Sequence, residues 1–146
     1  MPSLINTNNV SRSYSRVTTI CIDSDFNSGT TSFTGTNATA GISGSRLEVT
    51  DSGSGGGYAS RSFNTQPQTV YNYSIAYVEG TAGHLKLGTS ADDGTHVNMA
   101  VSSSDPGYGT ITGSFTATTK TTHITLRITR SSGTFKWDNL TISEDN

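Results

Sequence analysis

The chain has a single cysteine, few charged side chains and no long apolar run. Cys21 cannot form a disulfide within the chain, and its place beside Ile20 and Ile22 predicts an unpaired thiol in or near a sheet. No stretch approaches the ~20 apolar residues that a transmembrane helix needs, so we expect no membrane span. Charged residues make up 14% of the chain and the formal net charge is -2, so we expect no nucleic-acid partner.

Motifs for catalysis and for zinc are also missing. His84, His96 and His123 lack the close spacing of zinc ligands, and no cysteine pair accompanies them. The chain has no GxSxG nucleophile elbow and no phosphate-binding GxxxxGK[ST] loop. The acidic pair in Asp92-Asp93-Gly94 is typical of a turn. The sequence therefore predicts a protein that is not an enzyme.

Serine and threonine are abundant where charged and apolar residues are few, and together they make up about a third of the chain. Hydrophobic residues make up 31% of the chain and occupy alternating positions, which is the pattern of strands with one buried face. About eight or nine short strands separated by turn signals predict an all-β antiparallel sandwich or jelly roll. The expected strands are Thr18–Asp23, Arg46–Thr50, Tyr58–Phe63, Val70–Glu79, His84–Gly88, Val97–Val101 and Thr110–Ala117, with two more in Thr121–Ile142.

The stretch Thr121–Ile142 has the densest apolar pattern and the only tryptophan. Ile124, Leu126 and Ile128 alternate with polar residues, and a turn at 131–133 leads to a second strand, so we expect a central hairpin. In that second strand Phe135 and Trp137 share one face, but Leu140 and Ile142 restart the alternation one residue out of phase. A β-bulge at Asp138-Asn139 accounts for this shift.

The remaining expectations concern the core, the loops and the edges. The segment from Asp25 through Gly41 is expected to be a loop, SGSGGG at 52–57 another loop, and Tyr58–Phe63 an edge strand closed by Gln66-Pro67. Tyr71, Tyr73 and Tyr77 share a strand face and are expected to line the core. The predicted core contains Trp137, Phe135, Leu126, Ile128, Phe115, Ile75 and Leu87.

Residues 1–17 are expected to form an extended arm preceding a single sandwich domain at 18–146. The segment has no apolar stretch of the kind found in a secretory signal. Arg12, Tyr14 and Arg16 alternate with serines, a pattern suited to lying along another surface. We expect these three residues to contact neighbouring subunits, with an extra edge strand on the chain's own sandwich as the alternative.

The order of segments resembles a known family. DFNSG, RLEVT, YNYSIAYVEG, HLKLGTS, GTITGSFTA, ITLRIT and GTFKWDNLTI together resemble the carbohydrate-binding modules of the xylanase and glucanase type, over about residues 23–143. The resemblance implies the galactose-binding-like β-sandwich, a jelly roll. Similar modules also occur in bacteriophage structural proteins.

Sugar-binding members of this family use exposed aromatic platforms, whereas the only tryptophan here is predicted to be in the core. The resemblance therefore implies Tyr58, Tyr108 and Tyr14 as candidate glycan-binding residues. It also implies a structural calcium ion at Asp138, with Asp25 and Glu48 as further ligands and loop carbonyls completing the shell. The alternative is that Asp138 binds the backbone of its own bulge. We expect no other cofactor.

Two functions from different classes remain open. The main hypothesis is a bacteriophage virion structural protein, a capsid decoration or tail-associated module on the particle surface. Its partners would be copies of itself and other virion proteins. The initial Met, the absence of a secretion signal and the Ser/Thr/Gly-rich surface favour it. The alternative is a free-standing glycan-binding module, which would bind cell-surface or environmental glycans.

Overall fold

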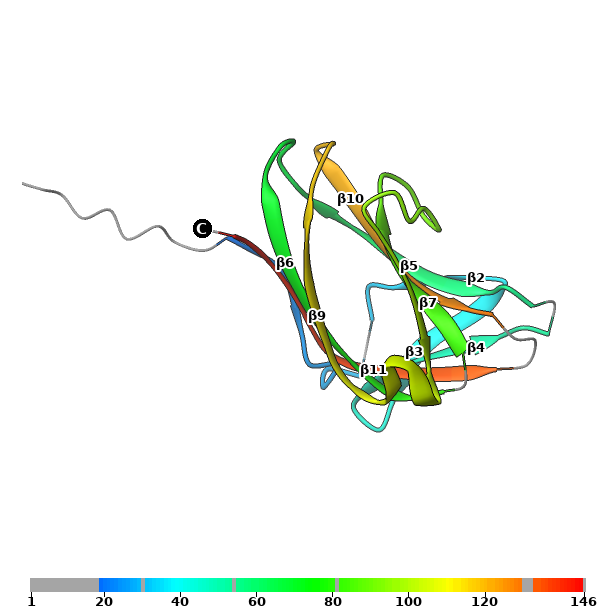
Figure 1. Ribbon diagram of the computed structural model, residues 1–146. Helices are drawn as coiled ribbons and strands as arrows, with labels where there is room; N and C mark the ends of the chain where they lie inside the picture. Colours follow the sequence, from blue (N-terminus) through cyan, green and yellow to red (C-terminus); the bar gives the residue numbers. More distant parts are fainter. Residues whose placement is uncertain (1–18, 30, 54, 81, 130–132, 146) are drawn as a thin grey trace, which may run out of the picture.

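The computed structural model describes residues 19–145, apart from 30, 54, 81 and 130–132. The described part is built from strands and one short π-helical turn, which confirms the all-β prediction (Figure 1). No helix in it has the length and apolar character needed to cross a membrane. The elements are β1 Ile20–Ser24, β2 Thr34–Thr36, β3 Ala38–Ser43, β4 Arg46–Asp51, β5 Tyr58–Asn64, β6 Val70–Glu79, β7 Ala82–Gly88, β8 Val97–Ser102, η1 Ser103–Gly107, β9 Gly109–Thr116, β10 Thr121–Ile128 and β11 Thr134–Glu144.

The strands form two antiparallel sheets that pack face to face as a jelly-roll sandwich (Figure 1). Sheet I has the order β3-β4-β11-β6-β9, with β1 also paired to β11. Sheet II has the order β2-β5-β10-β7-β8. The buried face of each sheet carries the alternating apolar residues and meets the other across the core.

The predicted hairpin of Thr121–Ile142 is wrong. β10 pairs with β5 and β7 in sheet II, whereas β11 pairs with β4, β6 and β1 in sheet I. Each strand is central, as expected, but they lie in opposite sheets. Alternation shows only that a strand has one buried face, and two strands facing each other across a core have the same pattern as two paired strands.

The bulge at Asp138-Asn139 is confirmed. Between Asp138 and Thr141 strand β11 advances by three residues while β6 advances by two, from Ala76 to Ser74. Asn139 takes the extra position with a φ of 49°, in the left-handed region that asparagine tolerates. Phe135 and Trp137 before the bulge, and Leu140 and Ile142 after it, are therefore all fully buried.

The core prediction is confirmed as well, since all seven of its residues are buried. Aromatic rings dominate one end: Tyr77 has its ring centroid 5.1 Å from that of Trp137 and 5.7 Å from that of Phe135. Tyr71, Tyr73 and Tyr77 are buried on the inner face of β6. They are core residues rather than a surface platform.

Two predictions about loops and edges are wrong. The expected loop from Asp25 through Gly41 contains β2 and most of β3, two short strands rich in Thr, Ala and Gly whose apolar signal is weak. Because β2 pairs with the first half of β5, strand β5 is not the edge of its sheet. The described part consequently has eleven strands instead of eight or nine.

Candidate functional site

The outer face of sheet II brings together aromatic, cationic, imidazole and hydroxyl side chains. Along the strand register, Tyr58 of β5 lies opposite Arg127 of β10, which lies opposite His84 of β7. The next row runs from Ser60 through Thr125 to Lys86. These side chains alternate with buried inward-facing residues, so they point away from the core. We call this set of six residues the sheet II face.

The β7–β8 connection, residues 89–96, folds over this face. The amide of Asp92 donates to the hydroxyl of Thr125 at 2.9 Å, and Thr125 is fully buried although it points outward. Gly88 permits the close crossing, because a Cβ there would lie 2.4 Å from the carbonyl oxygen of Asp93. In Figure 1 this connection, in yellow-green, extends beside β10 on the side away from β6 and β9.

Asp93 stabilises the shape of that connection from within. Its carboxylate accepts hydrogen bonds from the amides and hydroxyls of Thr89 and Thr95, at 2.6 to 3.1 Å. The hydrogen bonds from the Thr95 hydroxyl and the Thr89 amide are the main cause that lowers the pKa of Asp93 from 3.8 to about 2. The DDG sequence is therefore a turn, as predicted. Its conformation also positions Asp92 over the sheet II face.

Asp92 bridges two cations on the sheet II face. Its carboxylate accepts from Lys86 Nζ at 3.0 Å and from an Arg127 guanidinium nitrogen. The three side chains retain between 17% and 29% of their exposure, so the network is partly desolvated and accessible from solvent. With two positive charges and one negative charge, the group carries a net positive charge.

A second loop holds Arg127 from the other side. The buried carboxylate of Asp51 accepts from the amides of Gly53, Gly55 and Gly57 at 2.7 to 3.2 Å. At Gly56 the φ is +72°, and a Cβ would come within 2.7 Å of an Arg127 guanidinium nitrogen. The glycines thus let the backbone lie directly against the side chain.

His84 completes the row as a neutral group. Burial, with further contributions from Lys86 and Arg127, lowers the pKa of His84 below its ordinary 6.5, although Asp92 acts in the opposite direction. Its Nδ1 is buried and has no hydrogen-bond partner in the described part of the chain. A neutral imidazole here can donate or accept a hydrogen bond.

Next to these residues is a hollow of about 340 Å³ that continues the face toward β2. Its lining residues are Ser32, Thr34, Ser60, Arg61, Ser62, Ala91 and His123. Hydroxyl-bearing residues therefore predominate, and Arg61 stands at an inward-facing position of β5.

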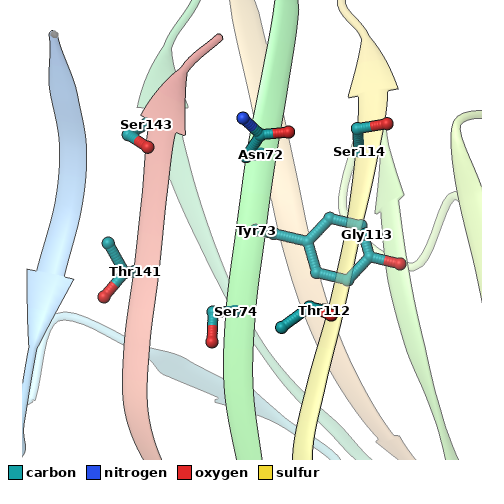
Figure 2. Close-up of a pocket in the computed structure, with 8 residues that line it drawn as sticks. All are labelled: Asn72, Tyr73, Ser74, Thr112, Gly113, Ser114, Thr141 and Ser143. Atoms are coloured by element: carbon teal, nitrogen blue, oxygen red, sulfur yellow. The ribbon is translucent and has the colours of Figure 1, made fainter.

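The outer face of sheet I offers a different surface. A shallow trough of about 430 Å³ runs across β11, β6 and β9 (Figure 2). Its outward side chains are hydroxyls and one amide: Asn72, Ser74, Thr112, Ser114, Thr141 and Ser143. The Tyr73 ring lies beneath, against Gly113, where a Cβ would be 2.4 Å from its hydroxyl oxygen. The trough therefore has no exposed aromatic ring and no charge.

The two described tyrosines that were predicted to bind glycan lie on different sheets. Tyr58 is half-buried on the sheet II face. Tyr108 precedes β9 of sheet I, where it is 54% exposed, packs with its ring centroid 5.3 Å from that of Tyr77 and donates to the Gly80 carbonyl at 3.0 Å. Both remain predictions as glycan-binding residues. Tyr14, with Arg12 and Arg16, lies outside the described residues.

The predicted calcium ligands each have another partner. Asp138 accepts from the amide of Asn139 at 2.8 Å, within its own bulge, and Asp25 accepts from the amide of Asn27 at 3.1 Å. Glu48 is 3.8 Å from Lys136 Nζ across the β4–β11 pair. Among the described residues no group of three or more His, Cys, Asp or Glu side chains could hold a metal ion. A calcium ion at Asp138 stays a prediction.

Sequence reasoning missed Arg127, Lys86, Asp92 and His84. Each had an ordinary explanation, as the polar alternate of a strand or as a turn residue. Only the pairing of β10 with both β5 and β7 places them together. A partial signal was present in ITLRIT and HLKLG, where a single cation interrupts each outward row of a strand otherwise poor in charge.

Comparison with known proteins shows a likeness of structure alone. No family model matches the sequence, and no curated protein matches it. Among solved structures, BiXyn10A CBM1 in its apo form superposes with a TM-score of 0.64 at 14% identity, over 86% of this chain and 99% of that one. A family 35 carbohydrate-binding module from Clostridium thermocellum gives 0.55 at 13%, over 87% and 98%.

The tandem CBM22-1-CBM22-2 domain from Paenibacillus barcinonensis Xyn10C gives a TM-score of 0.63 at 14% identity. That match covers 90% of this chain and 46% of the tandem, so this chain spans less than half of its length. At such identities the likeness concerns the fold. The chain has the jelly-roll sandwich fold of carbohydrate-binding modules.

Proposed function

We propose that the chain is a non-catalytic carbohydrate-binding module and that the sheet II face binds its glycan. The observation that carries the proposal is the row of Tyr58, Arg127 and His84, with Asp92 and Lys86 beside it, on a sandwich shared with such modules. The solved structures with this fold are named as carbohydrate-binding modules, including family 35 and family 29 members.

The chemistry of the face suits a sugar. An aromatic ring takes the apolar face of a pyranose, while charged and hydroxyl groups next to it bind the hydroxyls at the ring edge. Tyr58 supplies the ring, and its own hydroxyl has no hydrogen-bond partner in the described residues. Arg127, Lys86 and Asp92 supply charge-assisted donors and an acceptor.

The side chains are held in place before any ligand arrives. Asp51 shapes the loop against Arg127, and Asp93 shapes the loop that presents Asp92. Fixed side chains lose little conformational entropy on binding, which favours affinity for a ligand that forms few contacts. The trough of sheet I has no comparable organisation, because its outward hydroxyls make no hydrogen bonds to other described residues.

The virion hypothesis has no support of this kind. Its predicted assembly arm at residues 1–17 lies outside the described residues, and the solved structures compared above are named as carbohydrate-binding modules. The glycan-binding alternative is supported by the fold and by the sheet II face. We therefore prefer it, and the arm residues remain a separate prediction about assembly.

Calorimetric titration of the protein with soluble oligosaccharides tests the proposal. Tyr58→Ala should weaken binding by about 5–30-fold, which corresponds to roughly 1–2 kcal/mol of lost ring contact. Tyr58→Phe should retain most of the affinity, because the ring remains. Thr112→Ala, in the trough of sheet I, is the control and should bind like the unmodified protein. Loss of binding in Thr112→Ala with binding retained in Tyr58→Ala would show that the glycan binds sheet I, and would refute the proposed site.

A further inference from the structure

The hollow beside β2 continues the sheet II face along the strands rather than across them. In β5, Tyr58, Ser60 and Ser62 occupy successive outward positions, and the last two of these line the hollow. Ser62 stands four residues beyond Tyr58 in the strand, a distance on the order of 13 Å. A path along β5 therefore leads from the aromatic ring into the hollow.

The outward side chains around the hollow are hydroxyls and one imidazole. His123 of β10 lies opposite Ser62, and Thr34 of β2 lies opposite Ser60. None of these four side chains forms a hydrogen bond with another described residue. The side chain of Arg61 belongs to the inner side of the sheet, because it alternates with those of Ser60 and Ser62. The hollow thus offers unoccupied donors and acceptors with no lysine, arginine or carboxylate among its outward groups.

The β7–β8 connection closes the neighbouring path across the second row of the face. The amide of Asp92 binds the hydroxyl of Thr125, which is fully buried, and its carboxylate binds Lys86. Ala91 of the same connection lines the hollow, so the connection forms a wall beside β5. A ligand on Tyr58 therefore meets a barrier toward β7 at this row, whereas the side toward β2 stays open.

The first row offers few contacts beyond its centre. Arg127 is enclosed there by the Gly56 backbone and by Asp92. On β8, at the end of the row, the residue opposite His84 is Ala100, whose side chain has no polar group. The β8 edge of this row therefore adds no side-chain hydrogen bond that could select a second sugar unit.

We infer that the glycan on the sheet II face is a neutral oligosaccharide that extends along β5 from Tyr58 into the hollow, where His123 and Ser62 bind it. The inference rests on the proposed function and adds the length and the direction of its ligand. One unit stacks on Tyr58 with Arg127 at its edge, and the following units lie over the hydroxyls of β5. Hydroxyl and imidazole groups both donate and accept hydrogen bonds, as sugar hydroxyls do, so they match an uncharged chain.

Selectivity for chain length follows from the separation of the two contacts. A single sugar ring cannot contact both Tyr58 and Ser62, because they are on the order of 13 Å apart. A chain that reaches both gains the second set of hydrogen bonds without a second loss of translational freedom. Affinity should therefore rise with the number of sugar units until the hollow is filled, and then stay constant.

Calorimetric titrations of the full chain with oligosaccharides of increasing length test the inference. Xylo-oligosaccharides and cello-oligosaccharides, from disaccharide to hexasaccharide, are the probes. His123→Ala and Ser62→Ala should each weaken tetrasaccharide binding by about 2–10-fold, the effect of one lost hydrogen bond, and leave disaccharide binding unchanged. Asn98→Ala is the matched control, because Asn98 lies opposite Lys86 on β8 at the far end of the same face. That variant should bind both lengths like the unmodified protein.

The outcomes separate this inference from the proposed function. Affinity that rises with length, and loses that gain in His123→Ala, supports the course along β5. A gain lost in Asn98→Ala but retained in His123→Ala shows a chain that crosses the strands, and equal affinity at every length shows a single-unit site. Either result overturns the inference while the module remains a glycan binder.

The exposed Ser62 provides a second, independent variant. If His123→Ala weakens disaccharide and tetrasaccharide binding alike, the change is structural and Ser62→Ala decides. Unaltered tetrasaccharide binding in Ser62→Ala then overturns the inference, whereas a loss confined to the longer probes supports it. If neither series binds at any length, both the inference and the proposed function fail.

Discussion

Replacing Asp92 with asparagine should lower both the stability of the fold and the affinity for glycan. The carboxylate accepts from Lys86 Nζ at 3.0 Å and from Arg127. Asparagine has the same size and tolerates the left-handed backbone at this position, where φ is 61°. The loop should therefore keep its course, with the main-chain hydrogen bond to Thr125 intact. What changes is that two cations lose their counter-charge.

The cost follows from the burial of the three groups. Fully exposed ion pairs contribute about 0–1 kcal/mol, whereas breaking a buried pair costs about 3–5 kcal/mol. Side-chain exposures of 17%, 27% and 29% place this network between those limits. We expect a loss of roughly 2 kcal/mol, or about 6–10 °C in Tm for a sandwich of this length. Thermal melts followed by circular dichroism measure it.

Affinity for a soluble oligosaccharide should fall a few-fold in the same variant, because the charged acceptor that we propose for the sugar hydroxyls becomes a neutral amide. Asp145→Asn changes net charge equally at an exposed terminal position and should alter neither quantity. Unchanged melting of Asp92→Asn would show that the bridge contributes nothing to stability. Unchanged affinity for the oligosaccharide would show that Asp92 does not contact the sugar, which contradicts its assignment as an acceptor.

Other predictions concern the core, the loops and the arm. Trp137→Ala should cost roughly 3–5 kcal/mol in denaturant unfolding, whereas Trp137→Phe should cost under about 2 kcal/mol, because Nε1 has no hydrogen-bond partner in the described residues. Equal losses of stability in the two variants would show that the cavity left by alanine is not the cause. Asp93 has a folded pKa of about 2 against 3.8, so its stabilisation is complete above about pH 4 and disappears as the pH falls toward 2. Asp93→Asn should flatten the acid limb of a pH–Tm curve, and an unaltered limb would contradict this. Adding a chelator or calcium should leave Tm unchanged, whereas a calcium-dependent rise would establish an ion and direct attention to Asp138. Deleting residues 2–16 should leave a folded sandwich that no longer associates with its copies, as size-exclusion chromatography would report; unfolding or unaltered association would show that the arm was misinterpreted.

Local features were predictable because they depend on neighbours in sequence. The alternation in Val70–Glu79 indicated the buried face of β6, and the phase shift after Trp137 indicated the bulge that Asn139 occupies. Both effects arise from the two-residue period of a strand, which a single sequence displays directly. The resemblance carried by segments such as WDNLTI extended this to the jelly roll.

Pairing and the site were not predictable in the same way. Two central strands in opposite sheets look like a hairpin when only their alternation is visible. The three-residue strand Thr34–Thr36 has too little apolar content to be distinguished from a loop. Arg127, Lys86 and Asp92 are distant in sequence and meet only through the register of β10 with β7 and the crossing of residues 89–96.

The placement of β10 and β11 at the centres of opposite sheets has a consequence for biosynthesis. Both strands belong to the last part of the chain, yet β5 and β7 pair through one and β4 and β6 through the other. While the chain is still emerging from the ribosome, these earlier strands are synthesised before the central strands with which they pair. Their apolar faces therefore stay uncovered during that time. Both sheets can therefore form only after β10 and β11 are made, and until then the many serines and threonines of the nascent chain help to limit aggregation.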